Sequence, residues 1–397
     1  MRPSQSAPRN AVAVAAAILV VAAISVFAPS IAAADDASPA PGTVVSAKPL
    51  DRDLWIPDTT SRAFVLKYVT TNSFGELARS TGTVFIPKGK APEGGWPVIS
   101  WAHGTTGLGD SCAPSRTGPG LPERDWAYLG TWMEEGYAIV ATDYVGLGTP
   151  GLHPYLDTKT TAHSVVDMVK AGRNFADAHL PPHQRLAAKW VTTGQSQGGS
   201  AAISTAHYAT QFSGKELDFR GAVGTGTAAY VEDYLTALGP KSPPVGVTPA
   251  STAAISYTLS ALRYAHPELG IDNILTPAGK KYLKLAETQC VVEFRDTLKD
   301  VALGDYFTDP LATLPNFKDT VREYLGMPES GFDQPFFIAH GIADTNVPIP
   351  QTTRYAAVLK AHGEPLTFKA YPSDHSGTMA ASLPDTIHFV RERFSGP

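Results

Sequence analysis

Short, nearly continuous apolar runs alternate with longer amphipathic segments along most of this chain. Residues 96–102 (WPVISWA) and 137–143 (YAIVATD) are two such runs, and a glycine-containing loop follows each. Strands that are buried on both faces of a parallel sheet have this composition. Residues 163–178 instead repeat apolar side chains at helical spacing. The alternation of the two periods predicts an α/β fold with a doubly wound, mostly parallel sheet.

The chain before residue 96 follows a different pattern. Residues 64–87 alternate apolar and polar side chains around turn residues at 72–75, which predicts an antiparallel hairpin. Residues 35–48 are rich in alanine, serine and proline, and we expect them to form a flexible N-terminal arm.

The alternation of strand and helix stops between residues 229 and 333. Helical patterns occur in this interval at residues 251–265 and 279–298. We interpret 229–333 as a helical cap inserted into a core made of residues 49–228 and 334–397. Such a cap would supply a substrate pocket and exclude water. The alternative is a separate helical domain that has no contact with the site.

Residues 1–34 have the features of a secretory signal peptide. Two arginines precede an apolar run at 11–28, and three alanines ending at Ala34 offer a cleavage site before the acidic Asp35. The apolar run approaches spanning length, so an uncleaved membrane anchor is the alternative. We expect cleavage near Ala34, secretion, and no stable membrane span in the mature protein.

Composition narrows the range of partners. The formal net charge is −5, and no block of lysine and arginine occurs, so we expect no nucleic-acid partner. The 43% of hydrophobic residues is enough for a large core. The oligomeric state is left open by these features.

The chain has two cysteines, Cys112 and Cys290. In an exported protein we expect them to form a disulfide, which would tie the cap to the core. A bridge enclosing about 180 residues is worth roughly 5 kcal/mol in the chain-entropy model. Two buried free thiols are the alternative.

The segment most typical of catalysis surrounds Ser196. An apolar run at 190–193 is followed by Gly194-Gln195-Ser196-Gln197-Gly198 and then by a helix rich in small residues. A serine at such a strand–turn–helix junction is a nucleophile, with free helix N–H groups beside it. The G-x-S-x-G pattern is common by chance, so the prediction depends on partners elsewhere in the chain.

An oxyanion loop is predicted directly after the run at 96–102. His103-Gly104 begins a turn at the place where serine hydrolases of this architecture supply a second backbone donor. We expect the N–H groups of Gln197 and Thr105 to be the two donors, with Thr106 as the alternative to Thr105. His103 itself is expected to be structural.

Two later loops offer the remaining groups. Asp344 follows the predicted strand at 334–339, and His375 follows the last predicted strand at 365–371. The order Ser196, Asp344, His375 is the chain order of a triad in this fold. The imidazole would take the serine proton and the carboxylate would orient it. Asp143 precedes the serine, and we expect it to be structural or to line the site.

These motifs together resemble the secretory lipases of the fungal lipase A type, which also have bacterial members. The resemblance spans almost the whole mature chain and rests on SWAHGTTG with CAPS, DYVGLG with HPYL, GQSQGG, the region of Cys290, HGIADTNVP and YPSDHSG. It implies an α/β-hydrolase core under a helical cap, with lipase or carboxylesterase activity on acylglycerols and related esters.

The resemblance also implies site residues. It maps the nucleophile, acid and base onto Ser196, Asp344 and His375, supports pairing of Cys112 with Cys290, and implies no metal or organic cofactor. The substrate implied is an ester or lipid, and a lipid–water interface is one place where the protein could bind it. Two features depart from the fungal pattern: the HGTT region varies within the family, and the second disulfide of many fungal members is missing here.

Three other functions fit parts of the pattern. An exported acyltransferase would use the same triad with an acceptor alcohol in place of water. A serine peptidase of the prolyl-oligopeptidase kind shares GxSxGG, but its usual N-terminal propeller has no counterpart in the short segment before residue 96. A hydrolase fold that only binds a ligand is the alternative outside enzymes.

Overall fold

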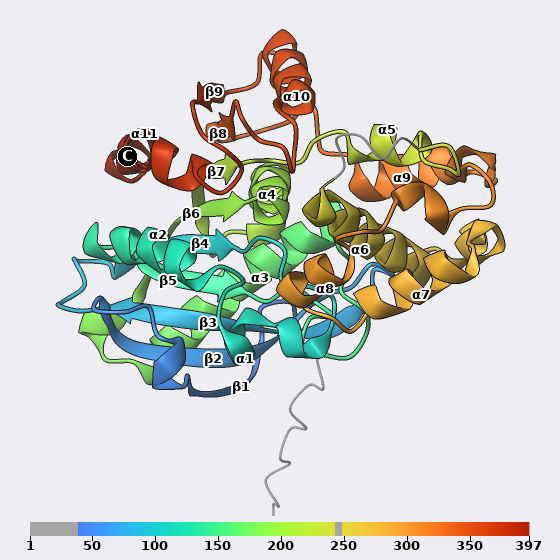
Figure 1. Cartoon of the computed structure of the whole chain (residues 1–397). Coiled ribbons are helices and arrows are strands. Elements are labelled where there is room, and N and C mark those ends of the chain that lie inside the picture. Colours follow the sequence, from blue (N-terminus) through green and yellow to red (C-terminus); the bar gives the residue numbers. More distant parts are fainter. Residues whose placement is uncertain (1–38, 243–247, 397) are drawn as a thin grey trace, which may run out of the picture. The chain divides into compact units, whose positions relative to one another are not determined.

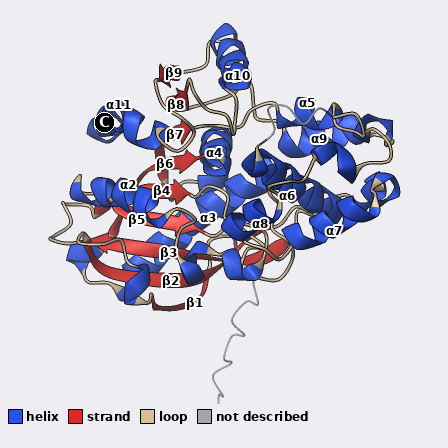
Figure 2. Ribbon diagram, in the orientation of Figure 1, coloured by secondary structure: helices blue, strands red, loops and turns tan. Residues whose placement is uncertain are grey.

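A computed structural model describes residues 39–242 and 248–396, and its elements are shown in Figures 1 and 2. The predicted signal peptide lies outside the described residues. Nine strands form one sheet. They are β1 (Val44–Pro49), β2 (Thr60–Thr71), β3 (Leu77–Pro87), β4 (Trp96–Ala102), β5 (Ala138–Thr142), β6 (Leu186–Gln195), β7 (Asp218–Thr225), β8 (Phe336–Gly341) and β9 (Leu366–Tyr371).

The helices fall into two groups, those beside the sheet and those between β7 and β8. The first group is α1 (Pro114–Thr117), α2 (Pro122–Glu134), α3 (Thr158–His179), α4 (Gln197–Ser213), α10 (Ile349–Ala361) and α11 (Thr378–Ser395). The second is α5 (Val231–Thr236), α6 (Pro249–Ala265), α7 (Pro277–Ala286), α8 (Val291–Thr297) and α9 (Phe317–Leu325).

The sheet order confirms the predicted fold class. It runs β1-β2-β3-β5-β4-β6-β7-β8-β9, with antiparallel pairing from β1 to β5 and parallel pairing from β5 to β9. The hairpin predicted at 64–87 is β2 and β3. The carboxyl ends of the parallel strands lie along one edge of the sheet, where a doubly wound fold binds its ligands.

Each parallel strand sends alternate side chains into two separate cores. In β8, Phe336 and Ile338 pack in the core that includes α3 and α4, whereas Phe337 and Ala339 pack in the core that includes α2 and α11. Strands covered on both faces need apolar side chains on both sides, which explains the continuous apolar runs of the sequence.

Residues 229–333 form a helical insertion with a hydrophobic core of its own. Tyr257, Leu259, Phe294 and Phe317 are fully or almost fully buried in it, and Leu108 and Tyr155 join it from the sheet side. Figure 1 shows α5 to α9 gathered together, in yellow to orange. The insertion therefore folds around its own apolar centre and also packs against loops of the core.

The predicted boundary of the N-terminal arm is wrong. The arm was expected to extend to residue 48, but Val44–Pro49 form β1, which pairs with β2. Most side chains of β1 are exposed, so backbone hydrogen bonds to the neighbouring strand define it. An apolar alternation that would reveal such an edge strand is missing. The core thus begins at Val44.

Within residues 39–242 and 248–396, no helix combines the length and the apolarity that a membrane-spanning segment requires.

Candidate active site

Ser196 lies at the tip of the tight turn between β6 and α4. Its backbone has φ 60° and ψ −120°, in the left-handed half of the map that side chains other than glycine rarely adopt. Such strain costs of order 1–3 kcal/mol and concentrates at functional sites. The Ser196 N–H donates to the carbonyl of Thr225 (2.9 Å), which fixes the turn against β7.

Two glycines let strand and helix approach each other at this turn. A Cβ on Gly194 would lie 2.0 Å from the carbonyl oxygen of Gly198, and one on Gly198 would lie 1.9 Å from the carbonyl oxygen of Ala102. No side chain fits at either position. The glycines two residues before and after Ser196 are therefore required by close packing, as the sequence pattern predicts.

Asp344 and His375 are brought together from neighbouring strands. Asp344 follows β8, His375 follows β9, and the His375 Nδ1–H donates to Asp344 Oδ2 at 2.6 Å. The backbone N–H groups of Asn346 and Val347 donate to Asp344 Oδ1 at 2.9 and 2.8 Å. Burial alone would raise the pKa of Asp344, but hydrogen bonds from His340 and His375 lower it well below its usual value.

His340 is a second histidine on this carboxylate, and the sequence analysis did not predict it. Its side chain is fully buried, and its Nε2 lies 2.8 Å from the carbonyl of Val347 and 3.3 Å from Asp344 Oδ2. Because a carbonyl only accepts, Nε2 carries the proton. The feature of the sequence that could have revealed His340 is its position in HGIAD, four residues before Asp344.

The proposed oxyanion donors lie beside Ser196. Gln197 is the first residue of α4, so its N–H has no acceptor within the helix. Thr105 borders the same cavities as Ser196 and His375, and its hydroxyl contacts the Tyr155 hydroxyl at 2.6 Å. Thr106 is more deeply buried, and its carbonyl accepts from Val291 N–H (2.8 Å). Thr106 lines the polar cavity as well, and its bond to Val291 uses its carbonyl and not its N–H, so Thr105 as the second donor stays a prediction.

His153 holds Gln197 from the other side. Its Nδ1–H donates to the carbonyl of Val145 (3.2 Å), which leaves Nε2 to accept from the Gln197 side-chain amide at 2.8 Å. Burial, and then the nearby charge of His103, lower the pKa of His153 to about 3, so the ring is neutral near pH 7. Nothing local in the sequence marks this contact, because it joins loops 44 residues apart.

The structure ties Asp143 and His103 into the scaffold. Asp143 accepts hydrogen bonds from the Ser115 N–H (2.9 Å), the Ser115 hydroxyl and the Thr81 hydroxyl (2.6 Å). His103 is buried, and its Nδ1–H donates to the carbonyl of Gly104 (2.7 Å). Both residues thus support the loops around Ser196, in agreement with the structural roles expected for them.

Two cavities of different chemistry meet at Ser196. The apolar cavity has a volume of about 170 Å³ and lies under the helical insertion. Besides Ser196 and Gln197, its walls include Tyr155, Ala229, Val231, Tyr234, Ala254 and Ile255.

The polar cavity has a volume of about 50 Å³ and lies on the side of His375. Besides Ser196, its walls include Thr105, Arg124, Asp125, Arg295, His375 and Ser376. A small space of about 40 Å³ shares residues with both cavities, among them Ala254 and Arg295. A larger open groove of about 1020 Å³ is lined by neither Ser196 nor His375, so we place the site at the smaller cavities.

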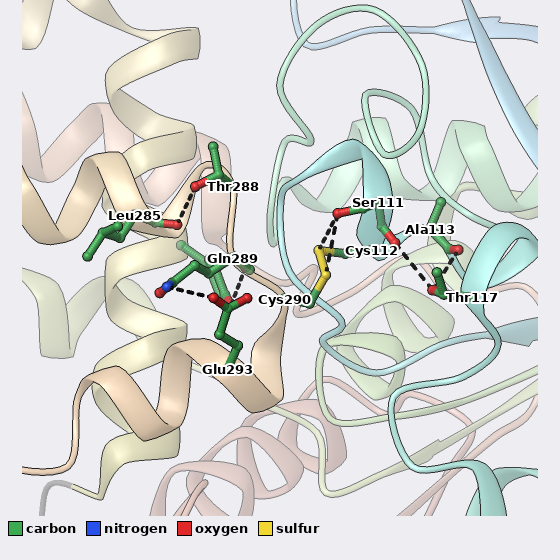
Figure 3. The surroundings of a disulfide bond; sticks show 10 residues. Ser111, Cys112, Ala113, Thr117, Leu285, Thr288, Gln289, Cys290 and Glu293 are labelled. Atoms are coloured by element: carbon green, nitrogen blue, oxygen red, sulfur yellow. Dashed lines mark hydrogen bonds between the residues drawn. A yellow bond between two sulfur atoms is a disulfide. The ribbon is translucent and has the colours of Figure 1, made fainter.

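Cys112 and Cys290 form the expected disulfide (Figure 3). The bridge joins the loop after β4 to the residue before α8 and closes a loop across 178 positions. Next to it, Gly107 and Cys290 form an isolated β-bridge, and the Val291 N–H donates to the carbonyl of Thr106. One edge of the helical insertion is thus fixed covalently and by hydrogen bonds to the predicted oxyanion loop.

Among the described residues, no group of three or more histidine, cysteine, aspartate or glutamate side chains is arranged to hold a metal ion.

Similar proteins come from fungi and bacteria. A secreted triacylglycerol lipase of Malassezia globosa is 25% identical over 380 residues, which is 90% of this chain and 77% of that protein. A protein of Mycobacterium tuberculosis named a probable inactive lipase is 22% identical over 371 residues, 90% of this chain and 79% of its own. The closed state of Candida antarctica lipase A superposes with a TM-score of 0.74 at 22% identity, covering 90% and 83% of the two chains.

The sequence family described as secretory lipase matches residues 123–397. This range is more than half of the chain and contains Ser196, Asp344 and His375. The chain belongs to the secretory lipase family.

Proposed function

We propose that the protein is a secreted serine ester hydrolase, a lipase or carboxylesterase, that works through Ser196, His375 and Asp344. The observation that carries this proposal is the Asp344–His375 hydrogen bond on the same cavity wall as a serine with φ 60°. Membership of the secretory lipase family supports ester hydrolysis, since relatives such as that of Malassezia globosa are named triacylglycerol lipases.

Acyl transfer to the serine would proceed in two balanced steps. Ser196 Oγ bonds to the ester carbonyl carbon while His375 takes the hydroxyl proton. The N–H groups of Gln197 and Thr105 stabilise the oxyanion. When the C–O bond to the alcohol breaks, His375 gives that proton to the leaving oxygen. Water then attacks the acyl-enzyme by the reverse sequence and releases the acid.

The apolar cavity is the proposed acyl site. It borders Ser196, and its walls come from α5, α6 and the chain before α10, so an acyl chain there would be covered by the helical insertion. This is the cap role that we propose for residues 229–333. A binding region that excludes water also strengthens the electrostatic contacts at the reacting carbonyl.

The test is a pair of variants assayed against p-nitrophenyl butyrate. We expect Ser196→Ala to abolish labelling by a fluorophosphonate probe and to lower kcat by about 10⁴-fold or more, as in other serine triads. Asp344→Asn should lower kcat by about 10⁴-fold because the tautomer of His375 would no longer be fixed.

Asp374→Asn, next to His375 on an exposed loop, is the matched control and should keep activity within about threefold. Full activity of Ser196→Ala would refute the assigned nucleophile. A folded wild type that neither reacts with the probe nor cleaves esters would instead place the chain with the relative named as inactive.

A further inference from the structure

The two cavities at Ser196 divide the ester between them. His375 must reach the leaving oxygen of the alcohol to protonate it. His375 lines the polar cavity and the small connecting space, but it is not among the residues that line the apolar cavity. The alcohol half of the ester therefore faces the polar cavity, and the acyl half faces the apolar one.

Arg295 is an unpaired cation in the wall of the polar cavity. Its side chain is half-buried, its Nε is buried without a hydrogen-bond partner, and no carboxylate pairs with it in the part of the chain that the structure describes. Burial has the largest effect and lowers the pKa of Arg295; Tyr155 and Tyr257 oppose this shift, and the positive charge of Arg124 adds to it. A guanidinium remains charged at neutral pH, and among the described residues no carboxylate is paired with this cation.

Arg124 adds a second guanidinium to the same wall. Its Nη2 pairs with Asp125 at 2.7 Å, and its Nη1 lies 3.4 Å from the hydroxyl of Ser376, next to His375. Asp125 balances the charge of Arg124, so Arg295 is the lining cation that no lining carboxylate pairs with. Guanidinium groups bind carboxylate and phosphate in a planar, two-bonded geometry.

Arg295 is also fixed in position relative to the reacting centre. It lies in α8, which begins directly after Cys290. The disulfide to Cys112 and the hydrogen bond from Val291 to Thr106 hold this helix against the predicted oxyanion loop. A cation on a rigid element costs little conformational entropy when it binds an anion, which is a property of a binding group.

We infer that the polar cavity is an alcohol site that selects esters whose alcohol carries a carboxylate or phosphate, bound by Arg295 with Arg124 beside it. This inference rests on the proposed function and adds the substrate class to it. A carboxylate could come from a hydroxy acid and a phosphate from a glycerophosphate. Both offer a pair of acceptor oxygens that a guanidinium can bind through two parallel N–H groups.

The experiment compares matched pairs of esters of butyric acid. The carboxylate pair is 4-(butyryloxy)benzoate and its neutral analogue 4-(butyryloxy)benzamide. The phosphate pair is 1-butyrylglycerol 3-phosphate and 1-butyrylglycerol. We expect kcat/KM of the wild type to be about tenfold or more higher for the anionic member of at least one pair. The ratio should fall as salt is added.

Arg295→Gln should reduce this ratio to about one and change kcat/KM for the neutral esters by less than about threefold. Arg295→Lys keeps the positive charge but loses the planar pair of N–H donors of the guanidinium. It should therefore retain part of the preference for the anionic esters. Arg322→Gln, an exposed arginine of α9 in the same helical insertion, is the matched control and should leave the ratio unchanged.

A wild type that cleaves the neutral esters equally well or better, with turnover that depends on Ser196, would overturn this inference and leave the proposed function intact. An equal loss on both members of each pair in Arg295→Gln would also overturn it. If no ester is cleaved, binding of the two free alcohols to the Ser196→Ala variant is measured by isothermal titration calorimetry. Binding of 4-hydroxybenzoate in preference to 4-hydroxybenzamide, lost in Arg295→Gln, supports the anion site, and equal binding refutes it.

Discussion

The apolar and polar cavities share Ser196, but the side chains that line them differ in chemistry. The apolar cavity is enclosed by small and aromatic side chains of α5, α6 and the chain before α10. The polar cavity is enclosed by the loop after β4, the start of α2, α8 and the loop after β9, and it presents two arginines. Both lie at the carboxyl edge of one sheet, so the same scaffold supports two kinds of recognition.

The two cavities can select the two halves of an ester by different physical effects. Burial of apolar surface is non-directional and grows by about 0.8 kcal/mol per buried CH₂ group, so the apolar cavity discriminates by size. A guanidinium discriminates by charge and geometry. Acyl preference should therefore vary gradually with chain length, whereas alcohol preference should depend on a single group.

Removing the disulfide has the largest effect that we predict for this comparison. The double variant Cys112→Ser/Cys290→Ser should lose about 2–5 kcal/mol of unfolding free energy, measured by urea denaturation. Because the bridge lies beside α8, the preference for anionic alcohols should fall more than the preference for acyl length. The oxidised and reduced wild type provide the control, since only the reduced form should match the variant. A variant with unchanged midpoint and unchanged alcohol preference would contradict the proposed role of the tether.

Filling the apolar cavity should affect only the acyl half. Ala254 lines this cavity from α6, and Ala254→Phe should lower kcat/KM for octanoate esters by about tenfold while acetate esters change by less than about threefold. A chain-length series of p-nitrophenyl esters measures this. Ala361→Phe, exposed at the end of α10, is the control. Equal losses on acetate and octanoate would place the acyl chain elsewhere.

The smallest predicted effect is a change of alcohol preference with pH. Burial raises the pKa of Asp125, although the charge of Arg124 opposes the shift. As the pH falls toward that raised pKa, Asp125 takes up a proton and Arg124 loses its counter-charge. The polar cavity then becomes more positive. The kcat/KM ratio of 4-(butyryloxy)benzenesulfonate to 4-(butyryloxy)benzamide should therefore rise by about two- to threefold as the pH is lowered from 7 through the range in which Asp125 takes up its proton.

Protonation of the catalytic base lowers the rate for both esters equally. The ratio of their kcat/KM values is therefore unaffected by it. The sulfonate stays ionised over this range, so its own titration does not contribute. In Asp125→Asn the ratio should be higher at pH 7 and nearly independent of pH. A ratio that falls with decreasing pH in the wild type would refute this role for Asp125.

The sheet could be predicted from the sequence where burial dictates composition. The apolar run at 96–102 is β4 to the residue, and that at 137–143 contains β5. The start of α3 was missed because a cap defines it: Asp157 accepts from the Thr160 N–H (2.9 Å) ahead of the apolar pattern. The helical pattern at 279–298 is interrupted before Cys290, where the chain turns to meet Gly107.

The residues of the candidate site likewise divide into those that local sequence patterns reveal and those that tertiary packing brings together. Ser196, Asp344 and His375 follow strands, so topology brings their loops to one edge, and local motifs with chain order were enough to select them. The contact of His153 with Gln197 and the place of Arg295 in the polar cavity instead depend on how distant loops and helices meet. Such contacts depend on how the insertion packs on the core, and no local spacing encodes that packing.

The fixed edge at α8 also restricts how the helical insertion can move. A helix tied by a covalent bond and by hydrogen bonds on the same side cannot slide away from its support. The disulfide, the Gly107–Cys290 bridge and the Val291–Thr106 hydrogen bond tie α8 in this way beside the oxyanion loop. Movement of other parts of the insertion would therefore leave the guanidinium of Arg295 at nearly the same distance from the reacting carbonyl.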